Sequence, residues 1–176
     1  MQDPFESAFY DYLSGNESAR VLVHCNKGED EIIPISYFFR NYEQMPELEK
    51  KALSLCSGKI LDIGAGSGIH SLYLESEGKD ITSLDIKPGF VDVMKKRGLS
   101  KVVLSDIFDY KKGKFDTLLM LMNGIGFTKN FDGLTAFLQQ AKKLLKPGGQ
   151  LLLDSSDLLY LYEDESESAS KHASAC

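Results

Sequence analysis

Residues 60–68 read Ile-Leu-Asp-Ile-Gly-Ala-Gly-Ser-Gly, and this stretch decides the fold. Three aliphatic residues surround one carboxylate, Asp62, and so apolar a run is typical of a strand buried on both faces of a parallel sheet. The glycines at every second position let the backbone turn sharply and let a ligand approach the main chain. Helical spacing follows over 69–77. Strand, glycine loop and helix together predict the ligand-binding turn of a doubly wound α/β fold.

The spacing of the glycines indicates which ligand this turn accepts. A dinucleotide fingerprint reads G-x-G-x-x-G, whereas here Asp62 precedes G-x-G-x-G inside the strand. This pattern resembles motif I of the class I S-adenosylmethionine-dependent methyltransferases. A carboxylate at that place suits a ligand that carries a positive amino group rather than a pyrophosphate.

The following hundred residues extend the resemblance. Strands are expected over 80–85, 101–105, 115–122 and 150–154, and an amphipathic helix over 132–145. The phrase FDTLLML…LLKPGGQLLLD is similar to the same family, and the resemblance runs from about Pro46 to Asp157. It implies an α/β, doubly wound, mostly parallel Rossmann-like sheet, with S-adenosyl-L-methionine as cofactor and S-adenosyl-L-homocysteine as product.

The resemblance also implies a set of cofactor-binding residues, each placed at the end of a strand. They are Asp62, Gly64, Ala65 and Gly66 for the amino-acid end, Asp85 and Ile86 for the ribose and adenine, Asp106 and Ile107 for the adenine, and Met122 and Asn123 beside the methyl group. Asn123 is a candidate for orienting the acceptor, and the sequence names no general base. The Asn-Pro-Pro-Tyr phrase of many amine-modifying members is missing, because the chain reads Asn-Gly-Ile-Gly from residue 123.

Composition limits the classes of partner. A net charge of −6 and a pI near 5.1 argue against a nucleic-acid-binding surface and leave a small-molecule acceptor. The sequence has no apolar stretch of about 20 residues, which argues against a membrane span. Three scattered cysteines without a C-x-x-C motif fit reduced thiols in the cytoplasm. The three histidines show no metal-ligand spacing, so no metal is expected.

Residues 1–57 are predicted to form an N-terminal extension with a cap and a lead-in helix. A short helix over 5–13, strand-like runs over 21–24 and 32–39, and a helix over 47–55 are expected there. The aromatic segment near Tyr37 and Arg40 makes these two residues candidates for an acceptor pocket. The alternative is that Arg40 pairs with a surface acid.

Residues 58–162 form the predicted cofactor-binding domain, and 163–176 a flexible acidic, serine-rich tail. The family fold has seven strands, yet only 22 residues follow Asp154. The expectation is therefore a sheet of five core strands, truncated after the fifth. Its last strand would be an exposed apolar edge, closed either by a homodimer or by the N-terminal hairpin.

Three functions remain open at this stage. The first is a methyltransferase that acts on a small molecule. The second is a non-catalytic S-adenosylmethionine-binding module or subunit, since the C-terminal part of the family fold is absent. The third, a nicotinamide-dependent oxidoreductase, is disfavoured by Asp62 and by the glycine spacing.

Overall fold

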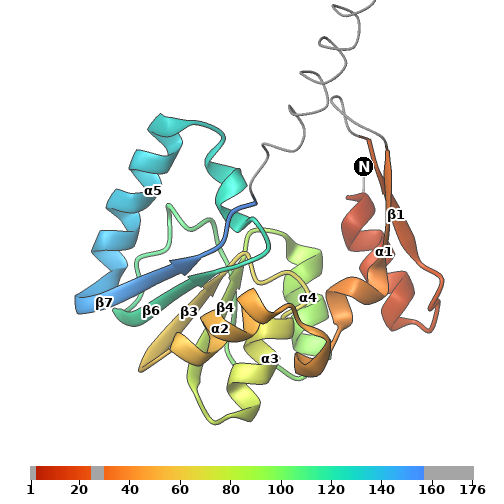
Figure 1. Cartoon of the computed structure of the whole chain (residues 1–176), viewed down its shortest axis with the longest axis horizontal. Coiled ribbons are helices and arrows are strands. Elements are labelled where there is room, and N and C mark those ends of the chain that lie inside the picture. The colour runs from red at the N-terminus through yellow and green to blue at the C-terminus, as the bar shows by residue number, and fades with distance from the viewer. Residues whose placement is uncertain (1–2, 25–29, 157–176) are drawn as a thin grey trace, which may run out of the picture.

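The computed structural model describes residues 3–24 and 30–156. Its centre is a parallel five-stranded sheet with the order β5-β4-β3-β6-β7 (Figure 1). The strands are β3 (Lys59–Ile63), β4 (Asp80–Asp85), β5 (Val102–Leu104), β6 (Phe115–Met120) and β7 (Leu145–Leu153). The predicted doubly wound α/β fold with five core strands is confirmed.

The order of the strands fixes where a ligand can bind. The chain runs outward from β3 to β4 and β5, then returns to form β6 on the other side of β3. In open α/β sheets, ligands bind in the crevice at the carboxyl ends of the strands where the direction reverses. That crevice lies here beyond the ends of β3 and β6, which the two glycine-rich loops follow.

Helices cover both faces of the sheet. On one face, α2 (Glu47–Leu55) and α3 (Ile69–Ser76) pack against Ile60, Ile81 and Leu119. On the other face lies α5 (Phe131–Leu144). Because successive strand residues point to opposite faces, Asp62 shares the α3 face with Ile60. Helix α4 (Pro88–Lys96) packs beside β5.

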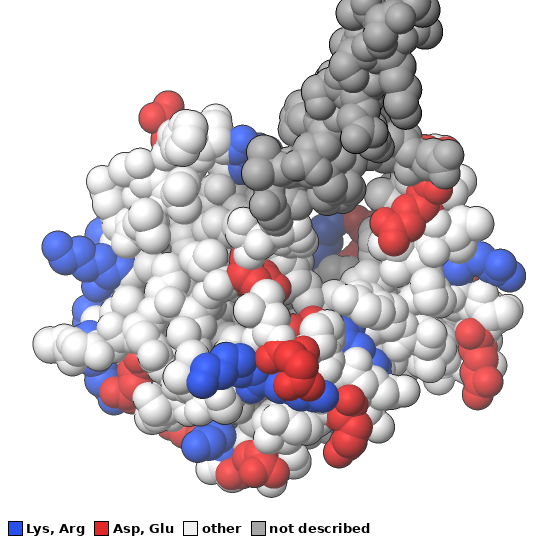
Figure 2. Space-filling model, viewed as in Figure 1, with Lys and Arg blue, Asp and Glu red and all other residues white. Residues whose placement is uncertain are grey.

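The charge distribution on the surface and the lengths of the described helices bear on the predicted partners. On the face drawn in Figure 2, lysine and arginine side chains are spread among acidic ones and form no single basic patch. Among the helices that the structure describes, none has the length and apolar character that a membrane span requires.

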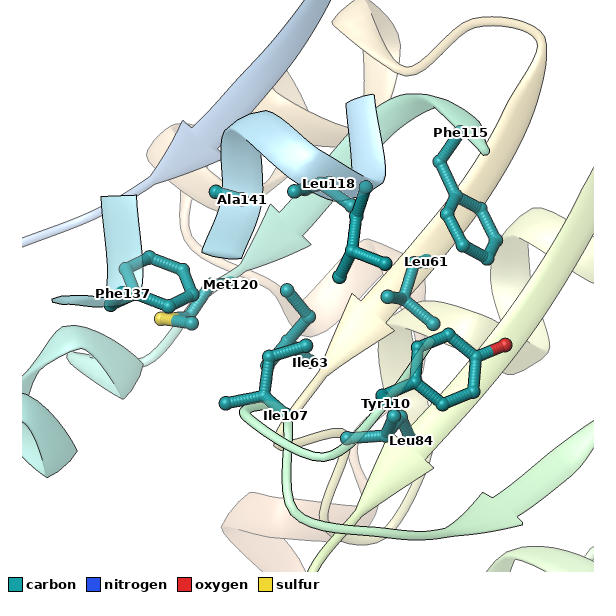
Figure 3. Packing of buried hydrophobic residues seen from close by; sticks show 11 residues of the cluster. Leu61, Ile63, Leu84, Ile107, Tyr110, Phe115, Leu118, Met120, Phe137 and Ala141 are labelled. Atoms are coloured by element: carbon teal, nitrogen blue, oxygen red, sulfur yellow. The ribbon is translucent and has the colours of Figure 1, made fainter. Parts of the chain in front are cut away.

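The core under α5 shows how the strand pattern becomes packing. Leu61 of β3 and Leu118 of β6 are fully buried in one cluster with Phe137 and Ala141 of α5 (Figure 3). Ile107 closes the same cluster from the loop after β5. This packing holds β3 and β6 together, and therefore holds the two loops that follow them at a fixed separation.

The N-terminal extension forms a separate layer on α4. It comprises α1 (Pro4–Leu13), the antiparallel hairpin of β1 (Arg20–Val23) and β2 (Glu31–Pro34), and the 3-10 turns η1 (Ile35–Phe39) and η2 (Tyr42–Gln44). The predicted hairpin is confirmed, although most of its turn lies outside the described residues. The strand predicted over 32–39 is wrong beyond Pro34, because that residue has no N–H for the ladder and the chain continues as η1.

Helix α1 is fixed to α4 by polar contacts along its length. The Asp3 carboxylate caps α1 and pairs with Lys87, while Glu6 accepts from the Gly89 amide at 2.7 Å. The Tyr10 hydroxyl donates to Asp92 at 2.8 Å. These contacts place α1 beside the start of α4, close to the crevice.

Of the two covers predicted for the edge of β7, a homodimer or the N-terminal hairpin, the hairpin is wrong. The hairpin pairs with itself and packs against α1, on the far side of the molecule from β7 (Figure 1). Among the described strands β7 pairs only with β6, and Leu153 at its end is 40% exposed. The tail predicted over 163–176 lies outside the described residues, and the homodimer stays a prediction.

Candidate functional site

Two chambers occupy the crevice at the reversal of the sheet, and Gly64 and Gly124 line both. The first chamber, of about 380 Å³, lies between the glycine loop, α1 and α4, and Asp62 lines it. The second chamber, of about 420 Å³, lies over the ends of β4 and β5, where Asp85 and Asp106 line it. The two shared glycines place the chambers next to each other as two ends of one crevice.

The loop after β3 leaves room for a ligand at its first two glycines. Gly64 and Gly66 have positive φ angles of 71° and 56°, and an added Cβ at either would meet no atom within 4 Å. At Gly68 an added Cβ would instead lie 2.6 Å from the side chain of Leu99. The first two glycines therefore border open space, whereas the third permits close packing of α3.

Asp62 is a buried carboxylate without a cation beside it. Its exposed fraction is 2%, and its Oδ2 accepts from the Ser71 hydroxyl at 2.7 Å, which in turn accepts from Ser83. Burial raises the pKa of Asp62. Among the described residues, no Lys, Arg or His nitrogen lies within 4 Å of it. A positive group on a ligand would supply the missing partner.

Asp85 both braces the loop and faces the second chamber. Its Oδ2 accepts from the Gly66 amide and its Oδ1 from the Lys87 amide, each at 2.9 Å. Burial raises the pKa of this carboxyl although the amide hydrogen bonds favour the charged form. Carboxylate oxygens carry further lone pairs, so Asp85 can also accept from ligand hydroxyls. The bracing of Gly66 is a second role that the sequence did not predict.

The far end of the second chamber combines one acid with apolar walls. Asp106 accepts from the Phe108 amide at 2.9 Å through Oδ1. Ile107 is buried, whereas Ile86 is 59% exposed beside the chamber. Such walls can cover a flat heterocycle while the carboxylate accepts from an exocyclic amine. The structure therefore brings the predicted residues Asp85, Ile86, Asp106 and Ile107 into one cavity.

The loop after β6 holds two non-glycine residues in the left-handed region. Met122 and Asn123 have φ angles of 60° and 58°, and their amides donate to Asp154 at 2.9 Å and 2.7 Å. Met122 lines the first chamber. The Asn123 side chain lines neither chamber, because its amide exchanges two hydrogen bonds with Ser156. A conformation this costly persists because Asp154 supports it.

Tyr37 and Arg40 line neither chamber. The Arg40 guanidinium lies 4.1 Å from the Tyr37 ring centre and pairs through Nη2 with both Glu49 oxygens, at 2.5 Å and 2.7 Å. Glu49 is itself buried, with an exposed fraction of 4%, so the acid that pairs with Arg40 is not a surface acid. Glu49 lies on α2 and reaches Arg40 of the N-terminal extension. The sequence pattern could not show this contact between two separate elements.

A buried histidine joins this ion pair to the first chamber. His70 Nε2 lies 2.9 Å from Glu49 Oε2, and the ring lines the chamber. Burial opposes the charged form of Glu49, but the hydrogen bonds and charges of His70 and Arg40 outweigh it and lower the pKa of Glu49. The buried cluster of Arg40, Glu49 and His70 therefore supports the wall of the first chamber from behind.

Another wall of the first chamber consists of four phenylalanines that the sequence did not indicate as site residues. They are Phe5, Phe9, Phe38 and Phe90. The aromatic segment 33–40 indicates this wall, but only the 3-10 geometry of η1 shows that Phe38 rather than Tyr37 lines the chamber. Phe38 faces the chamber, whereas Tyr37 is 43% exposed.

A doubly wound α/β domain with an acidic strand tip, a glycine loop and a second acid at the next strand defines a class of nucleotide-cofactor-binding proteins. Residues 61–153 match the family described as Methyltransferase domain, and the chain belongs to this family. A crystal structure of a SAM-dependent methyltransferase from Bacteroides fragilis, in complex with S-adenosyl-L-homocysteine, is 42% identical. It has a TM-score of 0.86 and is matched over 93% of this chain and 69% of that one.

Curated relatives are more distant. The ubiquinone biosynthesis O-methyltransferase of Xanthomonas oryzae is 28% identical over 111 residues, which cover 58% of this chain and 45% of that protein. The demethylmenaquinone methyltransferase of Tropheryma whipplei is 27% identical over 109 residues, which cover 58% and 44%. The chain thus spans less than half the length of these curated relatives.

Proposed function

We propose that this chain binds S-adenosylmethionine and transfers its methyl group to a small-molecule acceptor, with S-adenosylhomocysteine as the product. The observation that carries the proposal is the arrangement of Asp62, the open glycine loop and Asp85 around one crevice. The likeness to the Bacteroides fragilis protein, which was crystallised with S-adenosylhomocysteine, supports it. Membership of the methyltransferase family supports the reaction class.

Each part of the crevice fits one part of the cofactor. Asp62, a buried acid without a cation, would accept from the amino group, and the Gly64–Gly66 loop would take the adjoining chain. Asp85 would accept from the ribose hydroxyls. Asp106 would accept from the adenine amine in the second chamber, between Ile86 and Ile107. The amino-acid end of the cofactor would thus occupy the first chamber and the adenosine end the second, and the cofactor would pass Gly64 between them.

The bound cofactor would supply a methyl group already activated on a positive sulfur. The protein then has to hold the acceptor in line with that methyl group and exclude water. Met122 borders the first chamber and would lie beside the reacting centre. Asn123 would shape the loop beside Met122, since Ser156 holds its side-chain amide and Asp154 holds its N–H.

We also propose a small-molecule acceptor, a homodimer and a cytoplasmic site of action. The net charge of −6 supports a small molecule rather than a nucleic acid. Among the described strands β7 pairs only with β6, and this open edge supports a homodimer through β7. The scattered cysteines, of which Cys56 is a buried free thiol, support a cytoplasmic site of action.

A turnover assay tests the proposal against its two alternatives. The purified chain is incubated with S-adenosylmethionine carrying a labelled methyl group and a panel of small acceptors, and the release of S-adenosylhomocysteine is measured. We expect acceptor-dependent release and a rise in melting temperature with S-adenosylhomocysteine but not with NAD. A rise without any turnover would favour the non-catalytic binding module, and a rise with NAD alone would favour the oxidoreductase.

A further inference from the structure

The first chamber has a wall with no assigned role in holding the cofactor. Phe5 and Phe9 of α1, Phe38 of η1 and Phe90 of α4 line one side of it; we call these four residues the phenylalanine wall. The rings touch one another, with centres 5.7 Å apart for Phe5 and Phe38 and 4.8 Å for Phe9 and Phe90. Only Phe9 is buried, and the other three are partly exposed beside the chamber. The wall therefore offers aromatic surface that a ligand can cover.

The charges around this chamber are already paired, with one exception. Its ionisable lining residues are Asp3, Asp62, His70 and Lys87. Asp3 pairs with Lys87, and His70 pairs with Glu49 behind the wall. Asp62 alone has no ion pair among the described residues, and the proposed function gives it the amino group of the cofactor. An acceptor that brought a charge of either sign into the rest of the chamber would find no free counter-charge there.

The second chamber does not compete for the same role. Its carboxylates Asp85 and Asp106 match the hydroxyls and the amine of an adenosine group. If adenosine fills that chamber and the amino-acid end reaches Asp62, the space left beside the reacting centre is the space along the phenylalanine wall. Burying an apolar ring against these side chains is favourable, whereas burying a charge without a partner is costly.

We infer that the acceptor is an uncharged aromatic small molecule that lies against the phenylalanine wall. This inference rests on the proposed function and adds the substrate class to it. The four phenylalanine rings would pack against the aromatic ring of the acceptor. Helix α1, which Asp3 and Glu6 fix to α4, would form the outer side of the acceptor-binding site. The N-terminal extension would thus determine acceptor specificity, while the strand tips would determine the cofactor.

Fluorescent naphthalenes test the inference, because the chain has no tryptophan to compete for excitation. The chain is first titrated with S-adenosylhomocysteine, and the loaded chain is then titrated with 2-naphthol, 2-naphthalenesulfonate or 2-naphthylmethylammonium. We expect 2-naphthol to bind at least tenfold more tightly than either charged analogue. Equal or tighter binding of a charged analogue would overturn the inference, and so would competition of 2-naphthol with S-adenosylhomocysteine.

Two variants locate the bound ring. Phe38→Ala should weaken 2-naphthol binding at least fivefold, and by more than it weakens S-adenosylhomocysteine binding. Phe5→Ala, at the α1 side of the wall, should act in the same direction if Phe38→Ala fails to fold. Phe131→Ala is the matched control, since this phenylalanine on α5 is 87% exposed and lines neither chamber.

The outcomes separate this inference from the proposed function. Unchanged 2-naphthol affinity in both wall variants, with S-adenosylhomocysteine still bound, would overturn the inference alone. Absence of S-adenosylhomocysteine binding in the wild-type chain would overturn the proposed function, and the inference would fall with it.

Discussion

The two chambers of the crevice are built in different ways. The second chamber is made of strand tips, so backbone pairing of β4 with β3 and β5 sets the positions of Asp85 and Asp106. One side of the first chamber comes from α1 and η1, which side-chain packing and a few polar contacts hold against α4. We call the second chamber the rigid end of the site and the first chamber the packed end. Substitutions in α1 and η1 can alter the packed end while the strand tips keep the cofactor-binding residues in place.

The largest expected effect comes from Gly66, which lies next to the junction of the two chambers. Gly66→Val puts a β-branched residue at a φ of 56° and fills the open space beside the loop. We expect S-adenosylhomocysteine affinity, measured by calorimetry, to fall by more than about 100-fold. Gly78→Val is the control, because Gly78 has a φ of 72° and open surroundings but lines neither chamber. Equal losses in the two variants would show that strain, rather than occlusion, causes the effect.

Glu49 tests the packed end alone. Glu49→Gln leaves Arg40 buried beside a neutral partner, and removal of one member of a buried ion pair costs about 3–5 kcal/mol. Chemical denaturation should show that loss in the free energy of unfolding. Glu47→Gln on the same helix breaks an exposed pair with Lys50 and should cost about 0–1 kcal/mol. Similar losses for the two variants would mean that the buried cluster does not support the first chamber.

Asp85 tests the rigid end. Asp85→Ala removes the acceptor for the Gly66 and Lys87 amides as well as the proposed ribose contact. Lost hydrogen bonds to a charged group cost about 1.5–3 kcal/mol, so S-adenosylhomocysteine should bind roughly 10- to 150-fold more weakly in a calorimetric titration. Asp80→Ala, at the exposed start of the same strand, should leave the affinity within about twofold. Unchanged affinity in Asp85→Ala would contradict the placement of the ribose.

The smallest effect is a pH-dependent change in stability at Asp62. Burial raises the folded-state pKa of Asp62, so its charged form destabilises the empty fold, and that cost appears as the pH rises through the folded pKa. Asp62→Asn should therefore raise the melting temperature at pH 7, by an amount that shrinks toward acidic pH, while it weakens S-adenosylhomocysteine binding.

The control for Asp62 is an acid with the opposite shift. The Lys146 ammonium lowers the pKa of Asp116, so Asp116→Asn should lower the melting temperature at pH 7. A melting temperature for Asp62→Asn that falls at neutral pH would contradict the view that Asp62 is held as an uncompensated buried acid.

The same contrast explains what the sequence could predict. The strand over 80–85 and the helix over 47–55 appear with their predicted bounds, because apolar runs and turn residues act locally. The acids at the strand tips followed from those elements. The phenylalanine wall and the contact of Asp154 with Met122 depend on packing between segments far apart in the chain, which no periodicity encodes. For the same reason one of the two covers predicted for β7, the hairpin, lies beside α1 instead.

The most direct test of the central claim is a calorimetric titration of the 176-residue chain with S-adenosylhomocysteine, with Gly66→Val and Gly78→Val alongside. Our account predicts binding at a single site in the wild type and in Gly78→Val, and no measurable binding in Gly66→Val. Absence of binding to the wild-type chain, or equal binding to all three chains, would contradict the placement of the cofactor in this crevice.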